Sequence, residues 1–349
     1  MDAHAARRSG PRRITFVTNP DDCNLACRMC REHSPLASRR APPASWRLPH
    51  RVSRHMSTEL VEQILREREG SALAEVIPST KGEPLLWTGL DHLAEWCAAH
   101  DLLLNVTTNG TFPGRGATAW AELLVPVACD VKISWNAATA ATAAEIMGGL
   151  CLDRALEDVR AFVRVRDARR AAGARACRVS FQVTAQEANV VELAALVRLA
   201  AELGVERIKV NQLQIHHRQL AGQDLRRDTA SRARWNEAVR GMRAAVGEHR
   251  LPSGDPVLLQ NVEAWPEAFG EPARGPCPFL DREAWVTAEG RFAPCPAPAG
   301  QDGLLGDFGS LHDRPFGEIW ESAGYRALVD GYERHAECRR CPMRRAGGV

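Results

Sequence analysis

Between residues 12 and 215 the sequence alternates short β-branched and apolar runs with longer amphipathic stretches. This alternation is typical of βα units, which assemble into a parallel sheet. The six predicted strands cover residues 14–18, 73–77, 102–107, 129–134, 177–184 and 206–211. Predicted helices cover residues 58–68, 90–100, 139–147, 152–170 and 190–203. Six units are two short of a closed eight-stranded barrel, so we predict an α/β chain with a partial (β/α)6 TIM-like barrel.

The sequence predicts a tail before this barrel, and a connector and a small C-terminal domain after it. Residues 1–12 are expected to form a flexible tail, and residues 216–275 a connector or substrate-cap region with a helix at 231–247. From residue 276 onward the chain is rich in Pro, Gly, Cys and Trp, which is typical of a small domain folded around a metal centre. Aromatic residues there predict a folded core rather than a disordered tail: Trp285, Phe292, Phe308, Trp320 and Tyr325.

Composition narrows the cellular setting and the partners. The chain has 45 basic and 43 acidic residues, a balance that does not favour a nucleic-acid or membrane surface. No apolar run approaches the roughly 20 residues that span a bilayer, and the basic start lacks a signal-peptide core. We therefore predict a cytoplasmic protein, in which disulfide bonds are rare.

The cysteines fall into two groups and four single positions. The first group is Cys23, Cys27 and Cys30, and the second is Cys277, Cys295, Cys338 and Cys341. The single cysteines lie among apolar or helical residues, where a thiol packs as a small hydrophobe: Cys97, Cys129, Cys151 and Cys177.

The segment CNLACRMC places the first group within eight residues, directly after a predicted strand. Thiolates are the usual ligands of a 4Fe-4S cluster, which normally takes four of them. Three would leave one iron open to a ligand from outside the protein. The alternative is a zinc site with a more distant fourth ligand such as His33, although zinc sites prefer paired C-x2-C knuckles.

This C-x3-C-x2-C spacing after the first strand resembles the radical S-adenosylmethionine superfamily. The resemblance implies that the first cysteine group binds three irons and that the amino and carboxylate groups of S-adenosylmethionine chelate the fourth. It places Met29 beside the adenine ring. It further implies reductive cleavage to a 5'-deoxyadenosyl radical, with electrons from a reductant such as flavodoxin or ferredoxin.

Later motifs add to the resemblance, because parallel βα barrels place their sites at the C-terminal ends of the strands. PSTKGEPLL is similar to the family's Gly-Gly-Glu motif, with Lys81 in place of the first glycine. By resemblance the residues that contact S-adenosylmethionine are Gly82, Glu83, Thr108, Asn109, Ser134, Asn136 and Gln182. Taken singly, an Asn-Gly pair indicates a turn and a serine after a strand often caps a helix.

The second cysteine group has the spacing C-x17-C-x42-C-x2-C. Four thiolates are also a common set for structural zinc. The flanking GPCPFLDREAW, GRFAPC, LGDF and EIW resemble SPASM domains or their shortened twitch form. The resemblance implies one auxiliary 4Fe-4S cluster with all four irons held by protein, which is suited to electron transfer. It assigns residues 13–215 to the radical S-adenosylmethionine barrel and 276–349 to the auxiliary domain.

Three functions fit this sequence. The first is an oxidoreductase, a dehydrogenase or an epimerase, acting on a carbohydrate or aminocyclitol in natural-product biosynthesis. It is suggested by the single auxiliary cluster and by the short stretch of 22 residues before Cys23. The second is a maturase that crosslinks or epimerises a ribosomally made peptide, with a separate leader-binding protein. The third is a non-catalytic iron-sulfur protein, which Lys81 alone suggests.

Catalytic side chains are proposed by position only. A hydrogen donor for epimerisation could be Cys129 or Cys151, and a base could be Lys209, His216, His217 or Glu263. We expect the two thiols to be packed and the two histidines to be exposed to solvent. Arginines of the connector could attract an anion, but we expect a solvated surface: Arg218, Arg226, Arg227, Arg232 and Arg234.

Metal analysis of anaerobically reconstituted protein tests the two-cluster prediction. Two 4Fe-4S clusters correspond to about eight irons per chain with matching acid-labile sulfide. About four irons together with one zinc would instead assign one cysteine group to structural zinc.

Overall fold

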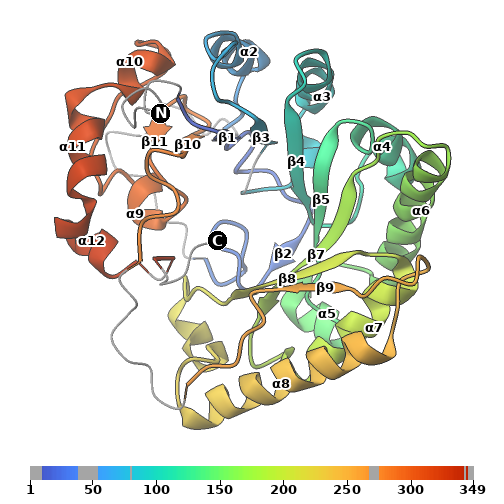
Figure 1. The fold of residues 1–349 in the computed structure, drawn as a ribbon. Coiled ribbons are helices and arrows are strands. Elements are labelled where there is room, and N and C mark those ends of the chain that lie inside the picture. The colour runs from blue at the N-terminus through green and yellow to red at the C-terminus, as the bar shows by residue number, and fades with distance from the viewer. Residues whose placement is uncertain (1–9, 38–53, 79–80, 267–274, 342, 345–349) are drawn as a thin grey trace. The chain divides into compact units, whose positions relative to one another are not determined.

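The computed structural model describes residues 10–37, 54–78, 81–266, 275–341 and 343–344 (Figure 1). The chain divides into two compact units, which are treated separately here. The first comprises residues up to 20, 54–104 and from 269 onward, and the second comprises residues 21–53 and 105–268. None of the described helices is long and apolar enough to cross a membrane.

The first unit is built on a mostly parallel sheet. Its strands follow the order β11 (Phe292–Ala293), β10 (Glu283–Val286), β1 (Arg13–Phe16), β3 (Glu75–Pro78) and β4 (Leu103–Thr108), which ends in the second unit. Strand β1 pairs in parallel with β10 on one edge and with β3 on the other. Helices α2 (Thr58–Arg66) and α3 (Leu90–Ala99) and the 3-10 turn η2 (Pro84–Leu86) connect the strands. The C-terminal strand β10 is therefore part of the same sheet as β1.

Both apolar and charged residues hold β1 in place. Ile14 and Phe16 are fully buried. Arg13 lies opposite Glu75 and Glu283 in the two neighbouring strands, and its guanidinium donates to both carboxylates, at 2.8 and 2.6 Å. Because side chains in register on adjacent strands lie close together, these pairs favour this register over a slipped one.

An aromatic core lies in the C-terminal part of the first unit. This part contains α9 (Pro298–Gln301), α10 (Phe316–Trp320), α11 (Ala323–Gly331), η5 (Tyr332–Arg334) and α12 (Ala336–Arg339). Phe292 packs edge-on against Phe308, Phe316, Trp320 and Tyr325, with ring centroids 5.1–6.3 Å apart. The predicted folded core of this region is confirmed.

The second unit has its own parallel strands: β5 (Ala128–Ser134), β7 (Arg178–Ala185), β8 (Arg207–Gln212) and β9 (Leu258–Gln260). Its helices are α4 (Gly116–Leu124), α5 (Ala140–Ile146), α6 (Leu152–Ala171), α7 (Leu193–Leu203) and α8 (Thr229–Glu248), with 3-10 turns η3 (Val190–Glu192) and η4 (Arg218–Gln223). Helices α4, α6 and α7 cover one side of the strands (Figure 1). A short ribbon pairs β2 (Ala26–Cys27) with β6 (Met147–Gly148).

The strands of the second unit have one apolar and one polar face. Val131, Ile133 and Phe181 are fully buried on the apolar face. The polar face contains Asp130, which accepts hydrogen bonds from the hydroxyl of Ser180, at 2.7 Å, and from Arg207. Successive residues of a strand point to opposite faces, so this division follows from the alternation in the sequence.

The predicted strands and helices are confirmed, and their ends are displaced by one or two residues, except that α7 begins three residues late because residues 190–192 form the 3-10 turn η3. Strand β9 lies in the stretch that was expected to be an irregular connector, and the predicted helix there is α8. The two compact units are defined by which residues pack together, whereas the predicted domain boundaries were set from sequence composition. The predicted boundaries at residues 12, 215 and 275 therefore stay a prediction.

A buried arginine ties α6 to the turn before β8 in the second unit. The side chain of Arg166 is 2% exposed, and it donates to Glu206 at 2.6 Å and to the carbonyl of Gly204 at 2.7 Å. Replacing Arg166 with Met removes the donor to that carbonyl and one of the two arginines that pair with Glu206, so it should lower the free energy of unfolding by about 2 kcal/mol. Denaturant unfolding measures this loss. The matched change Arg160→Met, at an exposed position of α6, should lower the free energy of unfolding by no more than about 0.5 kcal/mol. Equal losses from the two changes would contradict a stabilising role for the contacts of Arg166.

Candidate functional site

The first cysteine group lies on a loop that is braced by the chain after α5. Cys27 pairs with Met147 in the β2–β6 ribbon, and the backbone N–H of Arg28 donates to the carbonyl of Ile146 at 2.9 Å. Leu25 packs with Ile146 and Met147 in a small apolar cluster. Three of the predicted site residues pack against this cluster: Cys23, Cys27 and Met29. The loop is thus held by backbone pairing and by apolar contact.

The thiols of this loop influence one another electrostatically. Burial, reinforced by Cys30 and Cys23, raises the pKa of the Cys27 thiol to about 12. The thiol is therefore protonated at neutral pH. Because metals bind the thiolate, loading this loop has to displace protons.

Asn109 joins the end of β4 to the cysteine loop. Its side-chain N–H donates to the carbonyl oxygen of the Asn24 side chain at 2.7 Å, and its Nδ2 lies 3.9 Å from the sulfur of Cys23. Its own side-chain oxygen accepts from the backbone and the hydroxyl of Thr111, at 3.0 and 2.7 Å. The preceding Thr108 is buried and accepts from the N–H of Gly110. The structure therefore brings Asn109 to the cysteine loop.

Two more predicted contacts lie side by side at the ends of β5 and β7. Ser134 is in register with Gln182, and Gln182 is in register with Lys209 on β8. Residues in register on parallel strands share a face, so these three form a polar row. Asn136 is buried, and its side-chain oxygen accepts from the backbone N–H of Thr184 at 2.7 Å.

Glu192 is a structural residue of this site that the sequence analysis did not identify. Its carboxylate accepts from the backbone of Ala138 at 2.6 Å and from the hydroxyls of Thr139 and Thr142, at 2.6 and 2.7 Å. Although partial burial opposes the shift, hydrogen bonds from the two threonines hold the pKa of Glu192 below its usual range. Because α5 leads into the ribbon that braces the cysteine loop, Glu192 fixes the start of that brace.

Gly82 and Glu83 form an ordered turn in the first unit. Gly82 has φ of 73°, a left-handed conformation that glycine adopts without strain. Glu83 is 1% exposed, and one carboxylate oxygen accepts from the N–H of Leu85 at 3.2 Å. The carbonyl of Glu83 accepts from the side chain of Asn19 at 2.8 Å. The neighbouring Lys81 is half-buried.

The second cysteine group is also an all-thiol set. Burial, with smaller contributions from Cys277, Cys338 and Cys341, raises the pKa of Cys295 to about 12 against a hydrogen bond from the backbone of Ala297. Burial also raises the pKa of Cys338 to about 11. Among the described residues, no three or more His, Cys, Asp or Glu side chains converge on a position for a single metal ion. The four thiols are near enough to influence one another electrostatically.

The positional candidates for catalysis lie in different settings. Cys129 alternates with Asp130 and so lies on the apolar face of β5. Cys151 is exposed at the N-terminal end of α6, so the expectation that this thiol is packed was wrong. His216 and Glu263 are exposed. His217 was expected to be exposed as well, and this expectation was wrong.

His217 is half-buried, and its Nε2 lies 2.8 Å from the carbonyl oxygen of Cys30. The turn η4, which begins after His217, brings the imidazole to the cysteine loop. A contact across 187 residues of sequence leaves no local signal.

Three of the five connector arginines pair with acidic side chains. Arg226 bonds to Asp224, and both Arg227 and Arg234 bond to Glu187. These pairs agree with a solvated, ion-paired surface rather than an anion site.

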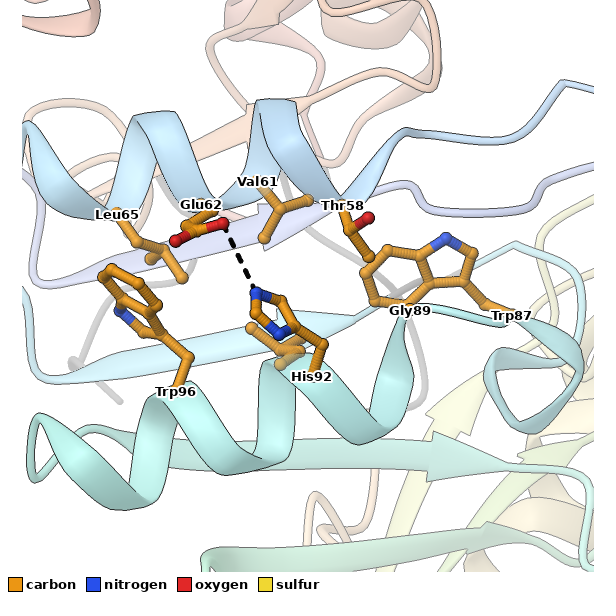
Figure 2. Close-up of a pocket in the computed structure, with 9 residues that line it drawn as sticks. Thr58, Val61, Glu62, Leu65, Trp87, Gly89, His92 and Trp96 are labelled. Atoms are coloured by element: carbon orange, nitrogen blue, oxygen red, sulfur yellow. Dashed lines mark ion pairs between the residues drawn. The ribbon is translucent and has the colours of Figure 1, made fainter.

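A hollow between α2 and α3 belongs to helix packing (Figure 2). Figure 2 shows His92 pointing toward Glu62, with 3.5 Å between Nε2 and the carboxylate. Trp87 and Trp96 line its two ends. The hollow contains no cysteine and none of the predicted contact residues.

Comparison with known proteins agrees with the fold and with an iron-sulfur role for the C-terminal segment. Residues 277–342 match the SPASM family, described as an iron-sulfur cluster-binding domain. SuiB of Streptococcus suis, solved with S-adenosylmethionine, matches with a TM-score of 0.67 at 18% identity. The match covers 98% of this chain and 73% of the SuiB chain. The protein anSMEcpe with bound AdoMet has a TM-score of 0.61 at 13% identity and covers 95% of this chain and 85% of its own. No curated protein sequence matches the chain.

These findings define the class. Residues 277–342 are similar to SPASM iron-sulfur cluster-binding domains, and the chain has the α/β fold of SuiB and anSMEcpe. The predicted resemblance and fold class are confirmed.

Gly148 offers a test of the brace on the cysteine loop. A Cβ at this position would lie 2.8 Å from the backbone carbonyl oxygen of Ala26, a clash that only movement of the loop relieves. Gly148→Ala should therefore lower the iron content by about four irons per chain, the content of one 4Fe-4S cluster. The control Gly247→Ala meets no atom within 4 Å and should keep the wild-type content. Wild-type iron in Gly148→Ala would contradict a bracing role.

Proposed function

We propose that this chain is a radical S-adenosylmethionine enzyme that abstracts hydrogen from an organic substrate. The observation that carries the proposal is the three-thiol loop of Cys23, Cys27 and Cys30, held by the β2–β6 ribbon and by the contact of Asn109 with Asn24. Two structures with the same fold were solved with S-adenosylmethionine bound. At this low identity, their structural likeness to the chain supports the fold. The cysteine spacing supports the chemistry.

The donor sets fit iron-sulfur clusters. Both are made of thiols, the usual ligands of such clusters. A cluster on the first loop, with S-adenosylmethionine on its open iron, would supply a 5'-deoxyadenosyl radical that takes one hydrogen atom from the substrate. The SPASM match supports a second cluster on the four C-terminal thiols.

The chain's own residues have the following proposed roles. The loop thiols hold three irons, and Met29 lines the adenine side. The polar row of Ser134 and Gln182, and the ends of the strands at Thr108 and Asn136, contact S-adenosylmethionine. Gly82 and Glu83 approach its amino group, where the left-handed Gly82 keeps the backbone free of a Cβ.

Two substrate classes have support. A carbohydrate or aminocyclitol is supported by the four-thiol auxiliary set. A cluster held there would accept one electron and a base would take one proton after hydrogen abstraction, so that a carbinol would be oxidised to a carbonyl. A peptide is supported by neighbours solved with peptides, SuiB with the precursor peptide SuiA and anSMEcpe with Cp18Cys. In both cases we propose an oxidoreductase or an epimerase, with flavodoxin or ferredoxin as reductant.

The formation of 5'-deoxyadenosine under dithionite tests the proposal. Wild-type protein should convert S-adenosylmethionine to methionine and 5'-deoxyadenosine, and Cys27→Ala should abolish this product because two thiolates cannot hold the cluster. The matched control Cys97→Ala removes a buried thiol of α3 and should retain product formation. Absence of product from fully iron-loaded wild type would favour a non-catalytic iron-sulfur protein.

Stimulation of this reaction separates the substrate classes. A true substrate should raise the rate of 5'-deoxyadenosine formation above the rate measured without substrate. Deuterium placed at the attacked carbon of the substrate should appear in the 5'-deoxyadenosine. Stimulation by aminocyclitols or sugars supports the first class, and stimulation by a peptide supports the second.

A further inference from the structure

Arg344 is a buried cation next to the C-terminal cysteines. It lies three residues after Cys341 and is 7% exposed. Its guanidinium donates in three directions: Nε to the carbonyl of Gly275 at 2.8 Å, one terminal nitrogen to the carbonyl of Cys338 at 3.2 Å, and the other to Glu333 at 3.1 Å. Two of these acceptors are backbone carbonyls that belong to segments carrying the cysteines.

Tyr332 completes this connection. The guanidinium carbon of Arg344 lies 4.9 Å from the centroid of the Tyr332 ring. The hydroxyl of the same tyrosine accepts a hydrogen bond from the backbone N–H of Cys277 at 3.2 Å. Arg344 and Tyr332 therefore link the segment around Cys277 to the segment around Cys338, which are far apart in sequence.

Only a fixed planar fork can satisfy acceptors in these three directions together. A lysine keeps the charge but places it at one point, and a glutamine keeps some donors without the charge. The anionic partner, Glu333, has a side chain that is 68% exposed, whereas that of Arg344 is 6% exposed. Water therefore screens the carboxylate far more than the guanidinium, and the positive charge acts mainly on the protein interior.

We propose that Arg344 is a positioning residue that holds the ligand segments of the auxiliary cluster and raises its reduction potential. This inference rests on the proposed function, which places a cluster on Cys277, Cys295, Cys338 and Cys341. Each reduction adds one negative charge to a cluster that four thiolates already make anionic. A nearby buried cation stabilises the reduced form more than the oxidised form. A cluster tuned in this way accepts an electron from the substrate more readily.

Redox titration of the auxiliary cluster, followed by electron paramagnetic resonance, tests the proposal. The full-length chain with Cys23, Cys27 and Cys30 replaced by Ala contains the auxiliary thiols alone, so its signal is unmixed. In this background R344Q should move the midpoint to a lower potential, such that the ratio of oxidised to reduced cluster at the original midpoint rises about tenfold. That ratio corresponds to about 59 mV for one electron. R344K should stay closer to the original midpoint.

A matched charge control is available at Arg340, which is exposed and adjacent to Cys341. R340Q also removes one positive charge, but at a position exposed to solvent. Water and salt screen that charge, so the midpoint potential should not change. Loss of the cluster from R344Q but not from R344K would also support a charge-dependent role.

Two results would overturn the inference. One is an unchanged midpoint in R344Q with a full cluster. The other is loss of the cluster from R344K and R344Q alike, which would make Arg344 a folding residue only. If the background protein with Arg344 intact binds no iron-sulfur cluster, the proposed auxiliary cluster itself fails, which is a separate result.

Discussion

The double pairing of β1 is the constraint on which the first unit depends. Hydrogen bonds from both of its edges join β3, which follows it in the sequence, and β10, which lies about 270 residues away. Arg13 reinforces both pairings through Glu75 and Glu283. The C-terminal cysteine segment is therefore anchored to the sheet of the first unit through β10. Because β1 leads along the chain into Cys23, one strand supports the start of the first thiol loop.

A second constraint is the brace on that loop. Three thiols close together repel one another when ionised and lose hydration when buried, as the raised pKa of Cys27 shows. The fold compensates with contacts that do not depend on charge, namely the β2–β6 ribbon and the apolar cluster of Leu25, Ile146 and Met147. Glu192 fixes the other end of α5. The loop is thereby preorganised for a ligand that brings positive charge.

Local sequence patterns were enough to predict most strands and helices up to α8, although α4 was not predicted. What the sequence could not indicate were contacts between distant positions. Strand β10 has only four residues and is paired to β1 by topology. Glu192 reaches α5 across about 50 residues, and His217 reaches Cys30 across 187. In each case the residue type is ordinary, and only the fold gives it a role.

The central claim is that S-adenosylmethionine binds directly to a cluster on Cys23, Cys27 and Cys30. Electron paramagnetic resonance of a reduced variant with Cys338 and Cys341 replaced by Ala tests it most directly, because that variant retains only the first thiol group intact. We expect a reduced 4Fe-4S signal whose g values shift when S-adenosylmethionine is added. A signal that S-adenosylmethionine leaves unchanged, or no cluster signal at all, would contradict it.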